Sequence, residues 1–579
     1  MLYKLLNECR NYSDYKFFDV KDLNQVSLSI NPVEEKLFNN DTFEIIEECV
    51  KINTSPIRKN KYLSGLLILE DNKTYGRVNK KNLYKCIPDD CRLPIFLVPY
   101  EFKKIGFSKK YLNLYITFEF FEWTSKHPIA KITQNLGNVD ELKNFYEYQL
   151  YCKSLNHSIQ PLNTKTLSNL NLKKKNNPNL IDQIIKEYQI LDLRFIENDW
   201  FIFTIDPLNC SDFDDAISIK YLENHQILLS IYISNVPIWI DYLELWDSLS
   251  KRISTIYLPD KKRPMLPTIL SDNLCSLKQD QKRVALCLDL IIQNCEIIEH
   301  KFSNVVIEIS KNFIYEEPSL LKNYHYNSIK TLLSTLKIDK HKFSFLKAVS
   351  DSHDLVANLM LFINYYSAEN LKIHKTGIFR TTFNTNTNNP PTIPSNCSEE
   401  LSSFLMYWQN ISGIYIPIKD KKESHSLNHL VLKLDCYVHI SSPIRRIVDL
   451  LNQIQFFQIN NLLSFSLPAK KFYYSWEENI DFVNTSMKSI RKIQSDCNLL
   501  HLVEINQLIL KKIYKGYCVD IIERGDSLFQ YIIYLPELKL TTRIIHSDKL
   551  NMYTEYNFSL YLFKNENTFK KKIRIQLEL

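Results

Sequence analysis

The chain contains 579 residues, of which 45% are hydrophobic and 24% are charged, and its formal net charge is +7. A chain of this length and apolar content has room for about three to five packed domains, which excludes a disordered or fibrous protein. The mild excess of positive charge permits a polyanionic partner without requiring one.

Thirteen cysteines are scattered along the chain with no CxxC pair and no histidine at metal-ligand spacing. We therefore expect reduced thiols in the cytoplasm, or in the nucleus as another reducing compartment. Charged residues interrupt the first segment, MLYKLLNECRNYSDYK, too early for a signal peptide, and no run approaches the roughly 18 apolar residues of a membrane helix. We expect a monomer that does not associate with membranes.

Taken in order, the chain predicts a multi-domain α+β protein. Residues 1–55 carry no defensible motif and stay unassigned as an N-terminal extension. Short β-like runs in residues 56–137 predict a five-stranded OB-fold barrel, a fold that often carries single-stranded nucleic acid but also serves as a plain scaffold. Residues 138–189 are a predicted helical linker to a central domain, residues 190–500, and residues 501–579 predict a second, degenerate barrel.

An acidic cluster lies between two apolar runs, Phe201–Ile205 and Ala216–Ile219, which are predicted to be buried strands. It consists of four aspartates, Asp206, Asp212, Asp214 and Asp215. Because neighbouring carboxylates repel one another, we expect something positive among them. Carboxylate oxygens favour a hard cation, so magnesium, or manganese in its place, is expected rather than zinc.

A calcium loop of the EF-hand type is the rival interpretation of this cluster, since Asp212, Asp214 and Glu223 fall at loop positions 1, 3 and 12. It fails because position 5 is Ala216, and position 6, where the turn requires glycine, is Ile217. An ordinary solvated acidic turn is the other alternative, and four aspartates between two apolar strands argue against it.

A second constellation is the sequence SSPIRR, in which Ser441 or Ser442 suits a helix N-cap and Pro443 suits the first helical position. A helix is therefore predicted to begin here, with Arg445 and Arg446 in its first turn. Two cations at the positive end of a helix are unfavourable unless an anion joins them, and the arrangement suits a phosphate. The alternative is a pair of surface arginines bridged to carboxylates. A metal cluster together with a phosphate clamp indicates phosphodiester chemistry.

Three segments carry a family resemblance: TIDPLNCSDFDDAISI, STIYLPDKKRPMLPTILSDNLCSL and YVHISSPIRRIVDLL. In order and spacing they resemble the signature blocks of the ribonuclease II and ribonuclease R family, the RNB-domain exoribonucleases. The resemblance covers residues 190–500, and YGRVN with WTSKHPIAKITQNLG resembles the preceding cold-shock-type barrel of the eukaryotic branch. It implies processive, magnesium-dependent hydrolysis of single-stranded RNA from the 3′ end to nucleoside 5′-monophosphates, with an RNA-binding barrel at residues 501–579.

By position, the resemblance assigns roles to individual residues. The four aspartates of the acidic cluster would hold metal, and Asp214 would be the carboxylate most critical for the chemical step. Arg445 would grip the phosphate near the scissile bond as a catalytic residue, with Arg446 beside it on the RNA. Tyr257 would stack on a base near the 3′ end, and Tyr315 would be a second aromatic contact. From the residues alone, both tyrosines would be ordinary core side chains.

The chain also departs from the family pattern. Asn358, in a helix predicted over residues 351–371, stands where relatives usually have Glu, and Gln453 stands where a His commonly follows the SPIRR block. Only one barrel is predicted before the central domain, where two are usual. Residues 1–55 are too short for the nuclease domain of exosome-associated relatives, so docking on an exosome is not expected.

Three hypotheses follow. The chain is an active exoribonuclease, a catalytically weak or non-catalytic RNA-binding relative, or an unrelated magnesium phosphodiesterase that acts on DNA or nucleotides. A broken acidic cluster would favour the second hypothesis, and the cluster here is whole. Selectivity for the 2′-hydroxyl would separate the first from the third.

Overall fold

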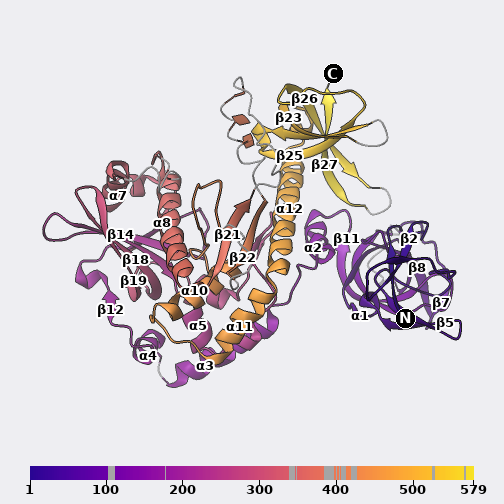
Figure 1. The fold of residues 1–579 in the computed structure, drawn as a ribbon, viewed down its shortest axis with the longest axis horizontal. Helices are drawn as coiled ribbons and strands as arrows, with labels where there is room; N and C mark the ends of the chain where they lie inside the picture. Colours follow the sequence, from indigo (N-terminus) through magenta and orange to yellow (C-terminus); the bar gives the residue numbers. More distant parts are fainter. Residues whose placement is uncertain are drawn as a thin grey trace. The chain divides into compact units, whose positions relative to one another are not determined.

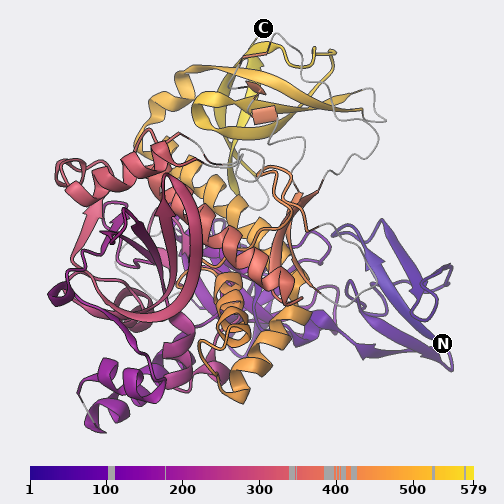
Figure 2. The same cartoon turned by 60° about the vertical axis from the view of Figure 1, so that its left-hand side comes forward.

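The computed structural model divides into two compact units, Met1–Asn156 with Leu258–Lys261 and Ser489–Leu579, and His157–Tyr257 with Lys262–Lys488 (Figures 1 and 2). The structure describes residues 1–101, 111–176, 178–337, 346, 348–383, 397–398, 401–402, 404–405, 412–418, 427–523, 528–565 and 569–578. Within these ranges, no helix combines the length and apolar character that crossing a membrane requires.

The first unit begins with a five-stranded antiparallel sheet in the order β3-β2-β1-β4-β5. Its strands are β1 (Leu2–Asn7), β2 (Tyr15–Asp19), β3 (Gln25–Val26), β4 (Thr42–Ile46) and β5 (Cys49–Thr54). Leu5, Phe17 and Phe43 point inward and share one apolar core with the barrel that follows. Residues 1–55, which the sequence left unassigned, therefore contain a sheet of their own ahead of the closed barrel. The strands were missed because each is short and none contributes more than one fully buried apolar side chain.

A closed barrel follows, with α1 (Pro56–Lys59) before it and α2 (Leu142–Cys152) after it. Its strands are β6 (Leu63–Leu67), β7 (Arg77–Val78), β8 (Lys81–Pro88), β9 (Phe96–Tyr100), β10 (Leu114–Glu122) and β11 (Ile129–Asn138). Five of them close a ring, β6-β10-β11-β9-β8, through the pairing of β6 with β8. Gly65 permits that closure, because a Cβ there would lie 2.7 Å from the ring of Phe118 and 2.9 Å from Cys86 Sγ.

The C-terminal sheet, yellow in Figure 1, has the order β25-β24-β23-β26-β27. Its strands are β23 (Ile513–Glu523), β24 (Phe529–Leu535), β25 (Leu540–His546), β26 (Glu555–Lys564) and β27 (Lys571–Glu578), and α12 (Ile480–Ile505) precedes them. Taken in chain order, the first strand pairs with the second and the fourth, as in the N-terminal sheet and in the closed barrel. All three thus share the connectivity of a five-stranded OB-type barrel.

The second unit is built on a seven-stranded mixed sheet in the order β12-β19-β18-β15-β14-β13-β20. Its strands are β12 (Asp192–Arg194), β13 (Phe203–Asp206), β14 (Asp215–Tyr221), β15 (Ile227–Ser234), β18 (Lys282–Gln293), β19 (Glu296–Glu308) and β20 (Lys311–Ile314). Tyr232, Ala285 and Val305, from neighbouring strands, belong to its buried core. β13 and β14 are adjacent, so the segment that joins them is held at both ends by the sheet.

Helices and two ribbons complete the second unit. The helices are α3 (Gln160–Asn176), α4 (Leu180–Glu187), α5 (Val236–Tyr242), α6 (Pro318–Leu321), α7 (Tyr324–Thr335), α8 (Ser352–Ile373), α10 (Ile447–Ile459) and α11 (Leu467–Glu478). The ribbons pair β16 (Ile256–Tyr257) with β17 (Lys262–Arg263) and β21 (Ile378–Phe383) with β22 (Ser412–Pro417). The helix predicted over residues 351–371 is confirmed as α8, which Asp351 caps by accepting a hydrogen bond from the Asp354 N–H at 2.8 Å.

A buried ion pair pins the edge of the seven-stranded sheet. Arg194 on β12 reaches across β19 and donates from Nη1 and Nη2 to the two carboxylate oxygens of Asp289 on β18, at 2.9 and 2.7 Å. Burial alone would raise the pKa of Asp289, but the hydrogen bonds and charge of Arg194 lower it. The pair therefore stabilises the fold at neutral pH, and its contribution is lost as the pH falls below about 3.8.

Removing Asp289 leaves the buried Arg194 with only the partly exposed Asp192 as its ion-pair partner among the described residues, at 2.8 Å. At pH 7 we expect Asp289→Ala to lower the free energy of unfolding by about 3–5 kcal/mol, whereas Asp289→Leu combined with Arg194→Met recovers most of that loss. Urea unfolding of the full chain, followed by circular dichroism, measures both variants. Equal losses in the single and the double variant would contradict this account.

Candidate active site

The acidic loop, residues 207–214, joins β13 to β14 and is fastened to the rest of its unit by Ser276. The Phe213 N–H donates to Ser276 Oγ at 3.0 Å, and that hydroxyl donates to the backbone oxygen of Ser211 at 2.8 Å. Because the sheet holds both ends and Ser276 holds the middle, the loop presents its carboxylates in a defined arrangement.

A cavity of about 690 Å³ opens beside this loop and collects side chains from segments far apart in the sequence. All eight predicted site residues line it: Asp206, Asp212, Asp214, Asp215, Tyr257, Tyr315, Arg445 and Arg446. Residues 207–211 and Lys262 complete the side of the wall formed by the loop. The other side comes from α8 and from residues 437–442, namely Val356, Met360, Asn364, Tyr437, His439, Ser441 and Ser442. The metal and phosphate residues predicted separately thus meet in one place within the second unit.

Asp214 connects the acidic loop to the arginine segment. Its carboxylate accepts hydrogen bonds from the Ile444 N–H at 3.0 Å and from Arg445 Nε at 3.0 Å, and its side chain is only 3% exposed. Arg445 also donates from Nη2 to Ser442 Oγ at 2.9 Å, while 43% of its side chain stays exposed to the cavity. A guanidinium held in this way is ready to bind an anion that enters the cavity.

The helix predicted to begin at Ser441 or Ser442 is wrong, because α10 begins at Ile447 and both arginines precede it. A buried carboxylate, Asp449, explains the difference. It accepts from the Ser442 N–H at 2.8 Å and from Arg446 Nη2 at 2.8 Å, so these groups turn inward. The expected clamp of helix N–H groups is therefore absent from this segment. Both arginines are instead bridged to carboxylates, and Arg446 is the less exposed of the two, at 20%.

Asp212 is engaged on both oxygens. Lys262 Nζ donates to Oδ1 at 2.9 Å, and the Tyr257 hydroxyl donates to Oδ2 at 3.3 Å. Sequence reasoning missed Lys262, although it lies in the segment LPDKKRPMLP. The segment offers three adjacent basic residues and no periodicity, so only the pairing of β16 with β17 reveals which of them faces the loop.

Asp206 and Asp215 differ from the other two aspartates, because no cationic side chain among the described residues forms an ion pair with either. Burial raises the pKa of both carboxyls to about 7; the charges of Asp214 and Asp212 add to the effect on Asp206, and the charge of Asp206 adds to the effect on Asp215. Asp206 Oδ2 is buried and has no partner among the described residues. An unpartnered carboxylate oxygen beside a second carboxylate suits a hard divalent cation. The predicted metal thus fits best at these two residues.

The full quartet does not enclose a metal as it stands. In the part of the chain that the structure describes, no three His, Cys, Asp or Glu side chains are arranged as a metal-binding group. Asp212 and Asp214 already bond to Lys262 and Arg445, so each would have to exchange a contact in order to become a ligand. Metal ligation by Asp206, Asp212, Asp214 and Asp215 together stays a prediction.

The two tyrosines are placed differently. Tyr257 is 41% exposed and is thus not the ordinary core residue that composition alone favours. Tyr315 is half-buried, stacks on His353 with ring centroids 3.8 Å apart, and donates its backbone N–H to the backbone oxygen of Asp206 at 3.1 Å. One face of Tyr315 is therefore already occupied. Contact with bases stays a prediction for both rings.

Asn364 on α8 organises the wall opposite the acidic loop. Its side-chain nitrogen donates to the Tyr437 hydroxyl at 2.9 Å and to Ser441 Oγ at 3.3 Å, and its oxygen accepts from the Ile440 N–H at 3.0 Å. Burial and the nearby charges of arginines lower the pKa of His439 well below its ordinary value, so that its imidazole is neutral. This wall was missed because its residues carry no motif of their own.

The residues noted as departures from the family pattern are buried. Asn358 lies on α8, and Gln453 lies on α10, where its amide nitrogen donates to the Ser234 oxygen at 3.0 Å. Among the described residues, Gln453 Oε1 has no partner. Neither side chain lines the cavity of the acidic loop.

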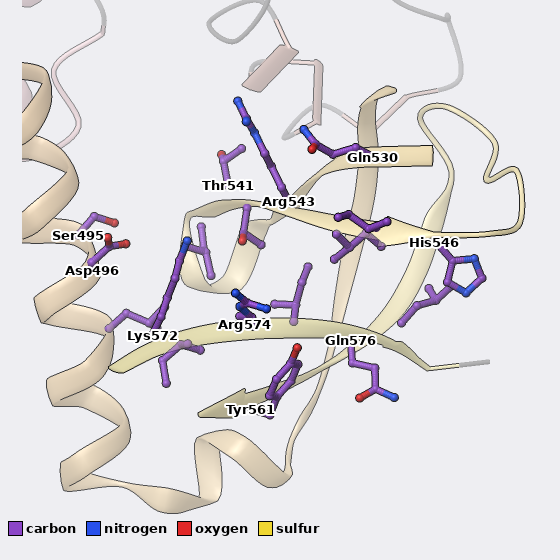
Figure 3. Close-up of a pocket in the computed structure, with 18 of the residues that line it drawn as sticks. Ser495, Asp496, Gln530, Thr541, Arg543, His546, Tyr561, Lys572, Arg574 and Gln576 are labelled. Carbon is purple, nitrogen blue, oxygen red and sulfur yellow. The ribbon is translucent and has the colours of Figure 1, made fainter. Parts of the chain in front are cut away.

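A second cavity, of about 1010 Å³, lies in the C-terminal part of the first unit, between α12 and the strands β25 and β27 (Figure 3). Figure 3 shows Arg543 from β25 and Lys572 and Arg574 from β27 around it, with Asp496 of α12 on its rim. Arginine and lysine outnumber carboxylates in this lining, so the cavity favours an anionic chain.

The sequence of this chain is similar to a known family and to several known nucleases. Residues 196–330 match the family model described as the RNB domain. Human exosome complex exonuclease RRP44 is 33% identical over 198 residues, which cover 34% of this chain and 20% of that protein. Ribonuclease R from Helicobacter pylori is 25% identical over 393 residues, 55% of this chain and 57% of that protein. Residues 196–330 therefore contain an RNB domain, and the chain is similar in sequence to proteins of the ribonuclease II and ribonuclease R family.

The fold itself is similar to solved structures over nearly the whole chain. Apo ribonuclease R from Mycoplasma genitalium has a TM-score of 0.66 at 17% identity and covers 99% of this chain and 96% of its own. Yeast Ssd1, described as a pseudonuclease, has a TM-score of 0.56 at 13% identity, covering 96% and 80%. The predicted α+β architecture, an RNB domain with OB-type barrels, is confirmed. In sequence, the matches to both curated relatives span less than two thirds of their length.

The raised pKa of Asp215 predicts how the metal-free protein responds to pH. In the folded protein the pKa of Asp215 is about 7, above its ordinary value of 3.8. The folded protein is therefore most stable while Asp215 is protonated, near pH 4, and it loses this stability as the pH rises through 7. In EDTA at pH 8 we expect Asp215→Asn to be more stable than wild type by about 1–3 kcal/mol, with little difference at pH 4.

Thermal unfolding at both pH values measures this effect, and Asp212→Asn is the matched control. Asp212 is paired with Lys262, so its replacement gives no gain at pH 8. The same gain from both replacements would show that general repulsion, and not the uncompensated position of Asp215, sets the effect.

Proposed function

We propose that this chain is a processive 3′-to-5′ exoribonuclease that degrades single-stranded RNA to nucleoside 5′-monophosphates with magnesium. One observation carries the proposal. Asp214 holds Arg445 directly inside the cavity that also contains the other three carboxylates, so an anion-binding group and a cation-binding group face the same space. The match to the RNB domain and the similarity to ribonuclease R support the choice of RNA as substrate.

In this proposal, different residues of the site bind the cation, the phosphate and the base. Asp206 and Asp215 would hold the divalent cation, which when bound lowers the pKa of a water and neutralises charge on the leaving oxygen. Arg445 binds the phosphate near the scissile bond, and Asp214 fixes the direction of its guanidinium through the Nε contact. Tyr257, with its exposed ring, stacks on a base, which is tolerant of sequence and suits a degradative enzyme.

The basic cavity of the C-terminal sheet adds affinity for the RNA backbone. Arg543, Lys572 and Arg574 neutralise phosphates there, and such contacts weaken as salt concentration rises. They carry no sequence information, which again suits a degradative enzyme.

A second candidate, an RNA-binding protein without turnover, is favoured by one observation. Lys262 and Arg445 already compensate Asp212 and Asp214, so half of the acidic cluster is neutral overall without any metal. A cavity of this kind retains RNA binding even if no divalent cation enters.

Turnover of a 5′-labelled single-stranded RNA, compared with the same oligomer as DNA, separates the candidates. With magnesium we expect a descending ladder to a short end product for RNA only, abolished by EDTA. Asp214→Asn abolishes cleavage with binding retained, because it removes the charge that holds Arg445 and leaves the cavity in place. Absence of cleavage by wild type in both magnesium and manganese would leave only the RNA-binding candidate.

The contact between Arg445 and Asp214 makes a second, quantitative prediction. We expect Arg445→Ala to reduce the single-turnover rate by about a hundredfold or more, with a smaller loss in RNA affinity, because an oriented guanidinium contributes most in the transition state. Arg445→Lys keeps the charge but not the forked geometry, so it restores affinity and not rate. Equal losses of rate and affinity in Arg445→Ala would mean that the side chain only tethers RNA.

A further inference from the structure

Lys262 has an unusually complete set of partners for a side chain at the edge of a cavity. Its ammonium donates to Asp212 Oδ1 at 2.9 Å, to Asp272 Oδ1 at 3.1 Å and to Ser211 Oγ at 2.7 Å. An ammonium group has three N–H donors, so three acceptors satisfy it fully. The charge is therefore held in one position, with Asp212 on one side and Asp272 on the other.

The backbone sets this position. In the ribbon of β16 and β17, Tyr257 and Lys262 are directly opposed, and their side chains bond to different oxygens of the same carboxylate. Asp272 is itself fixed, because Ser211 Oγ donates to its Oδ2 at 2.9 Å. The loop, the ribbon and the segment of Asp272 thus form one cage around the ammonium.

The cage divides the acidic cluster into two halves. Asp212 carries an internal ammonium and Asp214 carries an internal guanidinium, whereas Asp206 keeps a buried oxygen without a partner among the described residues. Phosphodiester-cleaving sites built on carboxylates often hold two divalent ions, which stabilise the attacking and the leaving oxygens. Here one half of the site is already filled by positive charge.

We propose that Lys262 is a resident cation that takes the place of one divalent ion, so that this chain binds a single divalent cation, at Asp206 and Asp215. The inference deepens the proposed function, since it names the source of the second positive charge at the same site. It concerns the number of ions bound, however, and so it can be tested without RNA. A purely structural lysine would leave that number unchanged when replaced.

The test is a Mn²⁺ titration of the full chain, with free Mn²⁺ measured by electron paramagnetic resonance. We expect wild type to bind a single Mn²⁺, and Lys262→Met, which removes the charge but keeps the length of the side chain, to bind a second one beside Asp212 and Asp272. The second ion also produces spin coupling between neighbouring Mn²⁺ ions. Lys262→Arg retains the charge and restores single-ion binding.

Lys186→Met is the matched control, because Lys186 is exposed on α4 and the same charge is lost away from the cavity. It binds a single Mn²⁺, as wild type does. Circular dichroism of each variant verifies the fold. Two ions in wild type, no ion in wild type, or a single ion in folded Lys262→Met would each overturn the proposal. If RNA cleavage fails while the change in ion number is found, the proposed function is wrong and the role of Lys262 stands.

Discussion

Repulsion among four aspartates, two in the acidic loop and two at the ends of the strands that flank it, is the constraint on which the rest of this site depends. Carboxylates this close and this buried persist only if positive charge compensates them. The chain supplies two of its own cations, Lys262 at Asp212 and Arg445 at Asp214, and both come from segments distant in sequence. Compensation therefore also assembles the cavity, because each ion pair fixes a different segment against the acidic loop.

Among the described residues, positive side chains do not compensate all four carboxylates. The carboxylates left without an ion-pair partner are the ones that we propose bind the metal ion. Burial raises the pKa of Asp206, Asp214 and Asp215 alike, but of these three only Asp214 has an ion-pair partner in the described part of the chain, Arg445. The fold loses stability at neutral pH by keeping Asp206 and Asp215, a cost that binding of a cation offsets. Arg445 and Arg446 also differ in how fully a carboxylate engages them. Arg446 is held by the buried Asp449, whereas Arg445 keeps an exposed edge toward the cavity.

Much of this arrangement was predictable from the sequence. The strand before Asp206, the helix at α8 and the meeting of the acidic loop with Arg445 follow from local patterns and from the family resemblance. The start of α10 was not predictable from capping preferences, because Asp449 competes for the Ser442 N–H through a contact that no local rule contains. Lys262 was missed for a similar reason. Its role depends on the register of a two-residue ribbon and not on its neighbours in sequence.

The central claim is that the chain's own cations hold one half of the acidic cluster and a single metal ion the other. Anomalous diffraction at the manganese edge, from crystals of the full chain grown with Mn²⁺, tests it most directly. The account predicts one anomalous peak at bonding distance from Asp206 and Asp215, with Lys262 still bound to Asp212. A peak between Asp212 and Asp272, with Lys262 displaced, would contradict it.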